Sequence, residues 1–233
     1  MKSLSYLLRS LVCIRVLPAV GLLGIVQCVQ ADPYTRFSAD PTAGNALDYM
    51  HQVATHPRCA NCHGKLLGGA HRPTVGDEQR SHPMNISSAN NLRLMADDHG
   101  FREVPGSAQA VNCRGCHQND NGLTVGSPPG AANALMPGFV WHMPPPTMII
   151  ADGLSAAELC EQWLDPARNS FLAVRGSRED LRTFEKEFVH HVRDDPLIRW
   201  SWEPGAGRSP APGSHTDFVR AMQVWIDAGV PCS

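Results

Sequence analysis

The sequence predicts a mainly α-helical protein of short helices joined by long loops. The 233 residues contain 19 prolines but only 6% aromatic residues, which disfavours both long regular elements and a large aromatic core. Helix-start residues followed by short apolar stripes recur along the chain, and no βαβ pattern is present. We therefore expect short helices and extended loops, with few or no strands.

Helices are expected in the N-terminal half at residues 42–56, 89–98 and 106–117. In the first, the spacing of Leu47, Met50 and Val53 places three apolar side chains on one face. In the second, Leu92 and Met95 form a short stripe.

The next segment, residues 119–147, is rich in Gly, Pro and Asn and predicts a loop stiffened by proline. After it, Ser155 and Glu158 form a capping box ahead of a helix at residues 156–164. A further helix is expected after Ser177, with the apolar stripe Leu181, Phe184, Phe188 and Val192. The last helix is expected after Ser214, with the apolar stripe Phe218, Met222, Trp225 and Ile226. The last stripe stops at Gly229.

One pentapeptide pattern occurs twice. Residues 59–63 spell Cys-Ala-Asn-Cys-His, and residues 113–117 spell Cys-Arg-Gly-Cys-His. In this pattern two thiols add to the vinyl groups of one porphyrin and the following histidine ligates the iron. A zinc ribbon also uses two Cys-x-x-Cys pairs, but it does not require a histidine after both. A thioredoxin-like redox motif would need a βαβ context.

At these two motifs the chain resembles the dihaem cytochromes c. The resemblance implies two c-type haems bound through Cys59 and Cys62 and through Cys113 and Cys116. The sequence-based fold class is therefore mainly α, with short helices and long loops wrapped around two covalently bound haems. The same resemblance implies electron transfer rather than enzymatic catalysis.

The proximal iron ligands are then His63 and His117. Two loop segments contain candidate ligands for the face of each iron opposite its proximal histidine. We rank His82 and His142 first and keep Met84 and Met143 as alternatives.

Other side chains are candidates for contact with the haems. Arg58 and Arg114 are candidate partners of haem propionates, although a solvated surface role explains them equally. Trp141, Trp200 and Trp202 are candidates for packing on a porphyrin face, although a protein core also accommodates tryptophan.

The N-terminus predicts export. Lys2, Arg9 and Arg15 precede an apolar run at residues 16–26, and the pattern ending at Ala31 is typical of signal-peptidase cleavage. A lipid attached to Cys28 or an uncleaved anchor are the alternatives, and we expect membrane association only if Cys28 is lipidated. Bacterial cytochromes c acquire haem outside the cytoplasm, so both signals indicate a periplasmic protein. We divide the chain into a cleaved signal peptide (1–31), a dihaem region (32–150) and a helical C-terminal extension packed on it (151–233), the last two forming one compact unit.

The remaining cysteines predict a disulfide. Of the eight, Cys13 and Cys28 leave with the signal and four belong to the motifs, so Cys160 and Cys232 remain for an oxidising compartment. Two buried free thiols are the alternative.

Removal of the signal peptide lowers the number of Lys and Arg residues from 20 to 17, while the number of Asp and Glu residues stays at 22. The mature polypeptide therefore has a net charge of −5. Such a chain has no electrostatic reason to bind nucleic acid. Its charge suits a redox-partner protein with a basic patch.

A second resemblance involves the stretch from Trp141 to Pro212, which is similar to bacterial haem proteins labelled as isoquinoline 1-oxidoreductase subunits. It implies a molybdenum hydroxylase or another periplasmic dehydrogenase as the electron donor, with a respiratory acceptor downstream. The alternative functions are a small peroxidase-like dihaem enzyme and a haem-based sensor, each with one five-coordinate iron.

Overall fold

The computed structural model describes residues 11–13, 28–67, 70–83, 86, 94–97, 100–103, 113–132, 141, 144, 146–150, 152–169 and 188–233. Among these residues the mainly α class is confirmed, because the two longest helices have 12 and 13 residues whereas the strands have two to four. Within the same part of the chain, no helix is long and apolar enough to cross a membrane.

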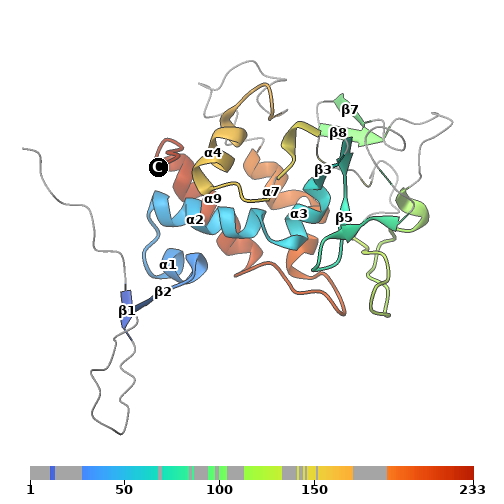
Figure 1. The fold of residues 1–233 in the computed structure, drawn as a ribbon, viewed down its shortest axis with the longest axis horizontal. Coiled ribbons are helices and arrows are strands. Elements are labelled where there is room, and N and C mark those ends of the chain that lie inside the picture. Colours follow the sequence, from blue (N-terminus) through green and yellow to red (C-terminus); the bar gives the residue numbers. More distant parts are fainter. Residues whose placement is uncertain are drawn as a thin grey trace, which may run out of the picture.

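The α-helices are α1 (Pro33–Ala39), α2 (Ala43–Ala54), α3 (Pro57–His63), α4 (Ala156–Leu164), α7 (His190–Asp194), α8 (Pro196–Arg199) and α9 (His215–Asp227). Three 3₁₀ helices are η2 (Cys113–Gly115), η3 (Pro146–Met148) and η5 (Trp200–Trp202). Figure 1 shows α2 in the middle of the helical half, and α1, α4 and α9 all pack against it.

The strands form four separate antiparallel pairs: β1 (Leu11–Cys13) with β2 (Cys28–Gln30), β3 (Lys65–Leu67) with β4 (Ala70–Arg72), β5 (Thr74–Val75) with β6 (Arg80–Ser81), and β7 (Leu94–Asp97) with β8 (Gly100–Glu103). The strands are short and every sheet has only two of them, in agreement with the expectation of few strands. Such short ribbons carry little apolar area and serve to fold loops back on themselves.

Two expected helices need correction. The helix predicted at residues 89–98 is a strand over its described part, because Leu94–Asp97 pairs with Gly100–Glu103 across a two-residue connection. The stripe of Leu92 and Met95 was too short to distinguish the period of a helix, about 3.6 residues, from that of a strand, about two. The helix predicted at residues 106–117 is, in its described part, only the single 3₁₀ turn η2.

Helix α2 forms the centre of the core. Thr42 caps it, accepting a hydrogen bond from the Asn45 amide at 3.3 Å, as the sequence predicted for its start. The predicted face of Leu47, Met50 and Val53 is buried. The core it nucleates includes side chains from both sides of residue 150, so the C-terminal helices complete the core of the N-terminal ones.

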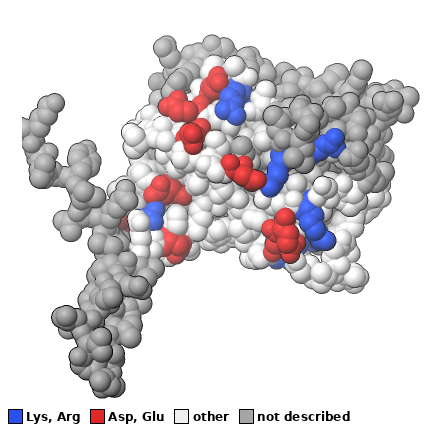
Figure 2. Space-filling view, viewed as in Figure 1, with Lys and Arg blue, Asp and Glu red and all other residues white. Residues whose placement is uncertain are grey.

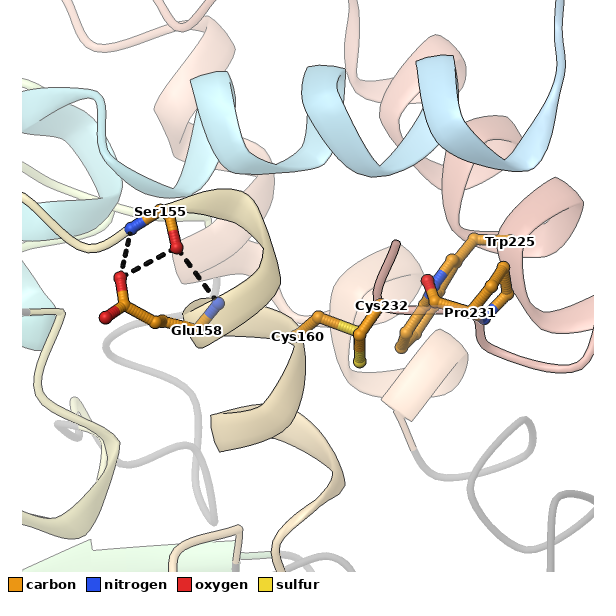
Figure 3. The surroundings of a disulfide bond; sticks show 6 residues. All are labelled: Ser155, Glu158, Cys160, Trp225, Pro231 and Cys232. Carbon is orange, nitrogen blue, oxygen red and sulfur yellow. Dashed lines mark hydrogen bonds between the residues drawn. A yellow bond between two sulfur atoms is a disulfide. The ribbon is translucent and has the colours of Figure 1, made fainter. Parts of the chain in front are cut away.

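The C-terminal helices are joined covalently. Ser155 and Glu158 form the predicted capping box of α4, and Cys160 on this helix is bonded to Cys232 (Figure 3). The disulfide closes a loop of 72 residues, which in the chain-entropy model stabilises the fold by about 4 kcal/mol. Trp225 of α9 donates from Nε1 to the Pro231 carbonyl at 2.9 Å, which holds the tail against the helix.

On the face of the described residues shown in Figure 2, acidic and basic side chains are interspersed.

Candidate functional sites at the two Cys-x-x-Cys-His motifs

The first motif lies on helix α3, which starts and stops for local reasons. His56 caps it, since its Nδ1 accepts from the Arg58 amide at 3.3 Å, and Pro57 occupies the first turn. The helix ends at Gly64, whose φ of 60° favours glycine. Because residues three and four apart share a helix face, Cys59, Cys62 and His63 lie on one side of α3.

The ring of His63 has a defined orientation. Its Nδ1 lies 2.7 Å from the Met148 carbonyl oxygen. A carbonyl only accepts, so Nδ1 carries the hydrogen and Nε2 is the nitrogen with the lone pair. Burial lowers the pKa of His63 to about 4, despite the opposing effect of that carbonyl, so the imidazole is neutral at pH 7.

The Met148 carbonyl is itself held in place. It belongs to η3, and the next carbonyl, that of Ile149, accepts from the buried Gln162 Nε2 of α4 at 3.0 Å. Helix α4 therefore fixes the segment that orients His63, and the core and the first motif are one structural unit.

The two thiols of the first motif are in a low-dielectric environment. Burial raises the pKa of Cys59 to about 12 and that of Cys62 to about 11, so both are protonated thiols at neutral pH. None of the four motif cysteines, all of which are described, is in a disulfide.

The second motif is wound more tightly and is more exposed. Its residues form η2, and the amide of His117 bonds to the Cys113 carbonyl at 2.8 Å, so one helical turn spans the pentapeptide. Cys116 is exposed, in contrast to both thiols of the first motif. The second motif therefore lies outside the main core, and its Cys113 packs against a separate small cluster of Ala131 and Trp141.

The second histidine repeats the orientation of the first. Nδ1 of His117 lies 2.8 Å from the Pro129 carbonyl, which leaves Nε2 as the nitrogen with the lone pair. Burial lowers the pKa of His117, which keeps the ring neutral. Trp141 stacks on this ring with centroids 4.2 Å apart and planes at 23°. The stacked indole covers a face of the imidazole and leaves its edge, where the nitrogens are, uncovered.

The structure brings the sequence-predicted His82 next to His117. The centroids of the two imidazoles are 6.2 Å apart with an interplanar angle of 37°. Nδ1 of His82 lies 2.7 Å from the Pro83 carbonyl, so here too Nε2 has the lone pair. A metal about 2 Å from one nitrogen of each ring, with each ring centre about 1 Å further, separates the centroids by about 6 Å. The observed spacing of 6.2 Å equals this value and also lies within the range of ordinary packing between two rings.

The other predicted distal ligands, Met84, His142 and Met143, lie outside the described residues. So does the side chain of Arg114. Of the predicted aromatic contacts, Trp202 packs in the main core against Phe218, with centroids 5.5 Å apart.

Several residues that shape the two sites were not found by sequence reasoning. The carbonyls of Met148 and Pro129 orient the histidines, but any residue supplies a carbonyl, so the sequence carries no signal for them. Asn121 accepts from the Gly130 amide at 3.2 Å and from Trp200 Nε1 at 2.7 Å, which holds the loop that carries Pro129. An Asn four residues after a motif, in a Gly-rich loop, is a signal that could have been used.

These arrangements fit a covalently bound haem at each motif, since paired thiols and an oriented, neutral imidazole are present at both. Among the described residues, no group of three or more His, Cys, Asp or Glu side chains is arranged to hold a metal ion. A porphyrin supplies four of the iron ligands itself, so a haem iron needs only one or two from the protein. Comparison with protein-family models, curated proteins and solved structures finds no match to this chain.

Proposed function

We propose that this chain is a periplasmic dihaem c-type cytochrome that transfers electrons between a dehydrogenase and a respiratory acceptor. The observation that carries the proposal is the shared orientation of the two motif histidines. Each Nδ1 is bonded to a main-chain carbonyl, at 2.7 Å for His63 and 2.8 Å for His117, and each ring is neutral. Iron-ligating histidines require this state, because the bond at the far nitrogen fixes the tautomer and the ring direction.

His82 supports electron transfer as the role of the second site. With His82 and His117 both as ligands, an iron at the second motif would have no open position for a substrate or gas. The ring spacing of 6.2 Å to His117 is the basis for assigning His82 as this distal ligand. The distal ligand of the first haem remains a prediction among Met84, His142 and Met143.

The haems supply the one-electron chemistry, and the chain's own residues control it. The carbonyl bonds make His63 and His117 better electron donors, which favours the oxidised iron. Burial of the first motif excludes water and strengthens nearby charge interactions. Exposure of Cys116 makes the second motif the entry or exit side for a partner protein.

The compartment and partner follow from the sequence. The predicted signal peptide and the Cys160–Cys232 disulfide both suit the periplasm. A net charge of −5 suits a partner with a basic surface, such as a molybdenum hydroxylase or another dehydrogenase.

Expression with a periplasmic cytochrome c maturation system tests the proposal. The purified protein should contain two haems per chain. The paired variants C59A/C62A and C113A/C116A serve as matched controls for each other, and each should contain one haem. A protein that reaches the periplasm under these conditions without haem contradicts the proposal.

The assignment of His82 is tested by the ferric absorption spectrum. H82A should convert the second iron from low spin to high spin. H215A is the matched control, because His215 also bonds a main-chain carbonyl, that of Val192 at 2.8 Å, but contacts neither motif histidine. It should leave the spectrum unchanged. An unchanged H82A spectrum, or a high-spin band in the unaltered protein, contradicts six-coordinate electron transfer at this site. The variants M84A, H142A and M143A then identify the distal ligand of the first haem.

A further inference from the structure

Trp200 lies between the two motifs and touches the surroundings of both. The Arg58 guanidinium carbon lies 5.8 Å from the Trp200 ring centroid, and the Arg208 guanidinium carbon lies 5.9 Å from it. Arg58 directly precedes Cys59 of the first motif. The indole Nε1 donates to Asn121, which holds the loop whose Pro129 carbonyl orients the second-motif histidine. The Arg58–Trp200–Arg208 stack therefore connects the two sites.

The stack contains more positive than negative charge. Arg58 is 2% exposed and pairs with Asp77 through Nη2, while Asp77 also accepts from the Ser209 amide at 3.1 Å and its hydroxyl at 2.7 Å. Arg208 forms no ion pair with any described residue. Among the described residues, two guanidinium groups are thus balanced by one carboxylate: Asp77 pairs with Arg58, and its charge also acts on the half-buried Arg208 without forming an ion pair with it.

Arg208 is also fixed and has hydrogens to spare. Its Nη1 donates to the Pro204 carbonyl at 3.0 Å and its Nη2 to the Ser127 carbonyl. These two bonds leave the Nε hydrogen and one hydrogen on each terminal nitrogen for another acceptor. A guanidinium held in this way binds a carboxylate through two parallel hydrogen bonds.

We propose that Arg208 and Trp200 form a carboxylate-binding site between the motifs, and that its occupant is a propionate of the haem attached at Cys113 and Cys116. This inference rests on the proposed function, because the occupant is part of that haem. The second haem is favoured over the first because Arg208 donates to the Ser127 carbonyl, two residues before the Pro129 carbonyl that orients His117. Arg58 already has Asp77 as its counter-ion and serves as a fixed charge behind Trp200.

The site has a measurable consequence for the reduction potential. A positive charge near an iron favours the reduced state, and Arg208 compensates the negative propionate. Removal of this guanidinium leaves the propionate uncompensated, so the oxidised iron gains stability. The potential of the second haem should therefore fall, while that of the first haem changes less.

Redox titration of the holoprotein tests the site with R208Q. R208Q should change the reduction equilibrium of one haem by at least about tenfold, which is a fall of about 60 mV for one electron. R208K retains the charge but not the two-pronged geometry, and should give about a threefold change, or about 30 mV, in the same direction. R220Q is the matched control. Arg220 makes the same kind of contact, 5.5 Å from the Phe37 ring, and belongs to α9. It should leave both potentials unchanged.

The same titration in buffers with and without sodium acetate identifies the source of the carboxylate. A propionate predicts potentials that do not depend on acetate in any variant. Potentials that change with acetate in the unaltered protein but not in R208Q indicate a free carboxylate and overturn the assignment to haem.

An R208Q protein with two haems and unaltered potentials contradicts the proposed carboxylate-binding site and leaves the proposed function intact. An unaltered protein without haem contradicts the proposed function itself. If R208Q does not accumulate, R208K decides, since potentials equal to those of the unaltered protein overturn the site.

Discussion

The two Cys-x-x-Cys-His motifs share a sequence pattern but not an environment. The first lies on an α-helix whose cysteines are partly buried and whose histidine is oriented by η3, beside a carbonyl that α4 binds. The second is a single 3₁₀ turn with an exposed cysteine, and its histidine is oriented by a loop carbonyl. The comparison teaches that the pentapeptide supplies the same proposed haem-binding residues at both sites, while the surroundings decide how strongly each site depends on the folded core. We expect core mutations to affect the first site more than the second.

The largest effect is expected from loss of the Cys160–Cys232 disulfide. The double variant C160A/C232A should lower the free energy of unfolding by about 4 kcal/mol, because the unfolded chain regains the entropy of a loop of 72 residues. Denaturant unfolding followed by circular dichroism measures this change. Hydrogen exchange should increase more at the His63 amide than at the His117 amide, and equal increases at both would contradict the proposed difference between the sites.

Substitution of one glycine at each motif compares how tightly the backbone is constrained at the two sites. Gly64 has a φ of 60°, and a Cβ there would collide with the His71 ring and the Arg72 carbonyl. G64A should therefore cost about 3 kcal/mol from backbone strain and overpacking.

In the second motif, a Cβ at Gly115 would meet nothing within 4 Å. The matched variant G115A should change the stability by less than about 1 kcal/mol, and in the stabilising direction. Thermal unfolding of the two variants checks this, and equal losses would show that the helix end at the first motif is not constrained as described.

The Arg58–Asp77 ion pair predicts a pH dependence. Hydrogen bonds from the Ser209 side chain and amide, together with Arg58, lower the pKa of Asp77 below its ordinary value. The folded-state pKa is thus below the unfolded value, so the stabilisation is present above about pH 4 and is lost as the pH falls through the folded-state value.

D77N should cost about 2 kcal/mol at pH 7, less than for a fully buried pair because the Asp77 side chain is 36% exposed. The difference in the free energy of unfolding between D77N and the unaltered protein should shrink as the pH falls from 5 to 3, about one unit either side of the ordinary carboxyl pKa. Urea unfolding across this range measures it. A deficit that stays constant with pH would mean that Asp77 acts through its shape and not through its charge.

A smaller loss of stability than that of D77N is expected at the cap of α4. S155A removes the hydroxyl that accepts from the Glu158 amide at 3.3 Å and should cost about 1 kcal/mol. T42A at the cap of α2 is the matched comparison, because the Thr42 hydroxyl likewise accepts from a helix amide, that of Asn45 at 3.3 Å. Both should lower the melting temperature by similar amounts, and S155A alone should loosen the segment that orients His63. Hydrogen exchange at residues 148–150 distinguishes the two variants.

Much of this fold was predictable because its signals are local. Thr42, Ser155 and Ser214 cap the helices that their sequences predicted, and the cysteines left over from the motifs form the expected disulfide. The hairpin at residues 94–103 was missed, because four residues of strand and a four-residue helical stripe look alike.

The surroundings of the motifs were harder to predict because they depend on distant contacts. The carbonyls of Met148 and Pro129 are backbone atoms that any sequence provides. Arg208 reaches the second site from more than 90 residues further along the chain, and no spacing rule connects the two. The ranking of His82 first among the distal ligands agrees with its position beside His117, but its ligation remains a prediction.

Intact mass spectrometry of the protein purified from the periplasm measures covalent haem attachment at the two motifs. We expect a chain that begins at Asp32 and is heavier than its polypeptide by two covalently attached haems. In C59A/C62A and in C113A/C116A one haem mass should be lost. A mass equal to that of the bare polypeptide, from cells that attach haem to a control cytochrome, would contradict the claim that the two motifs are haem sites.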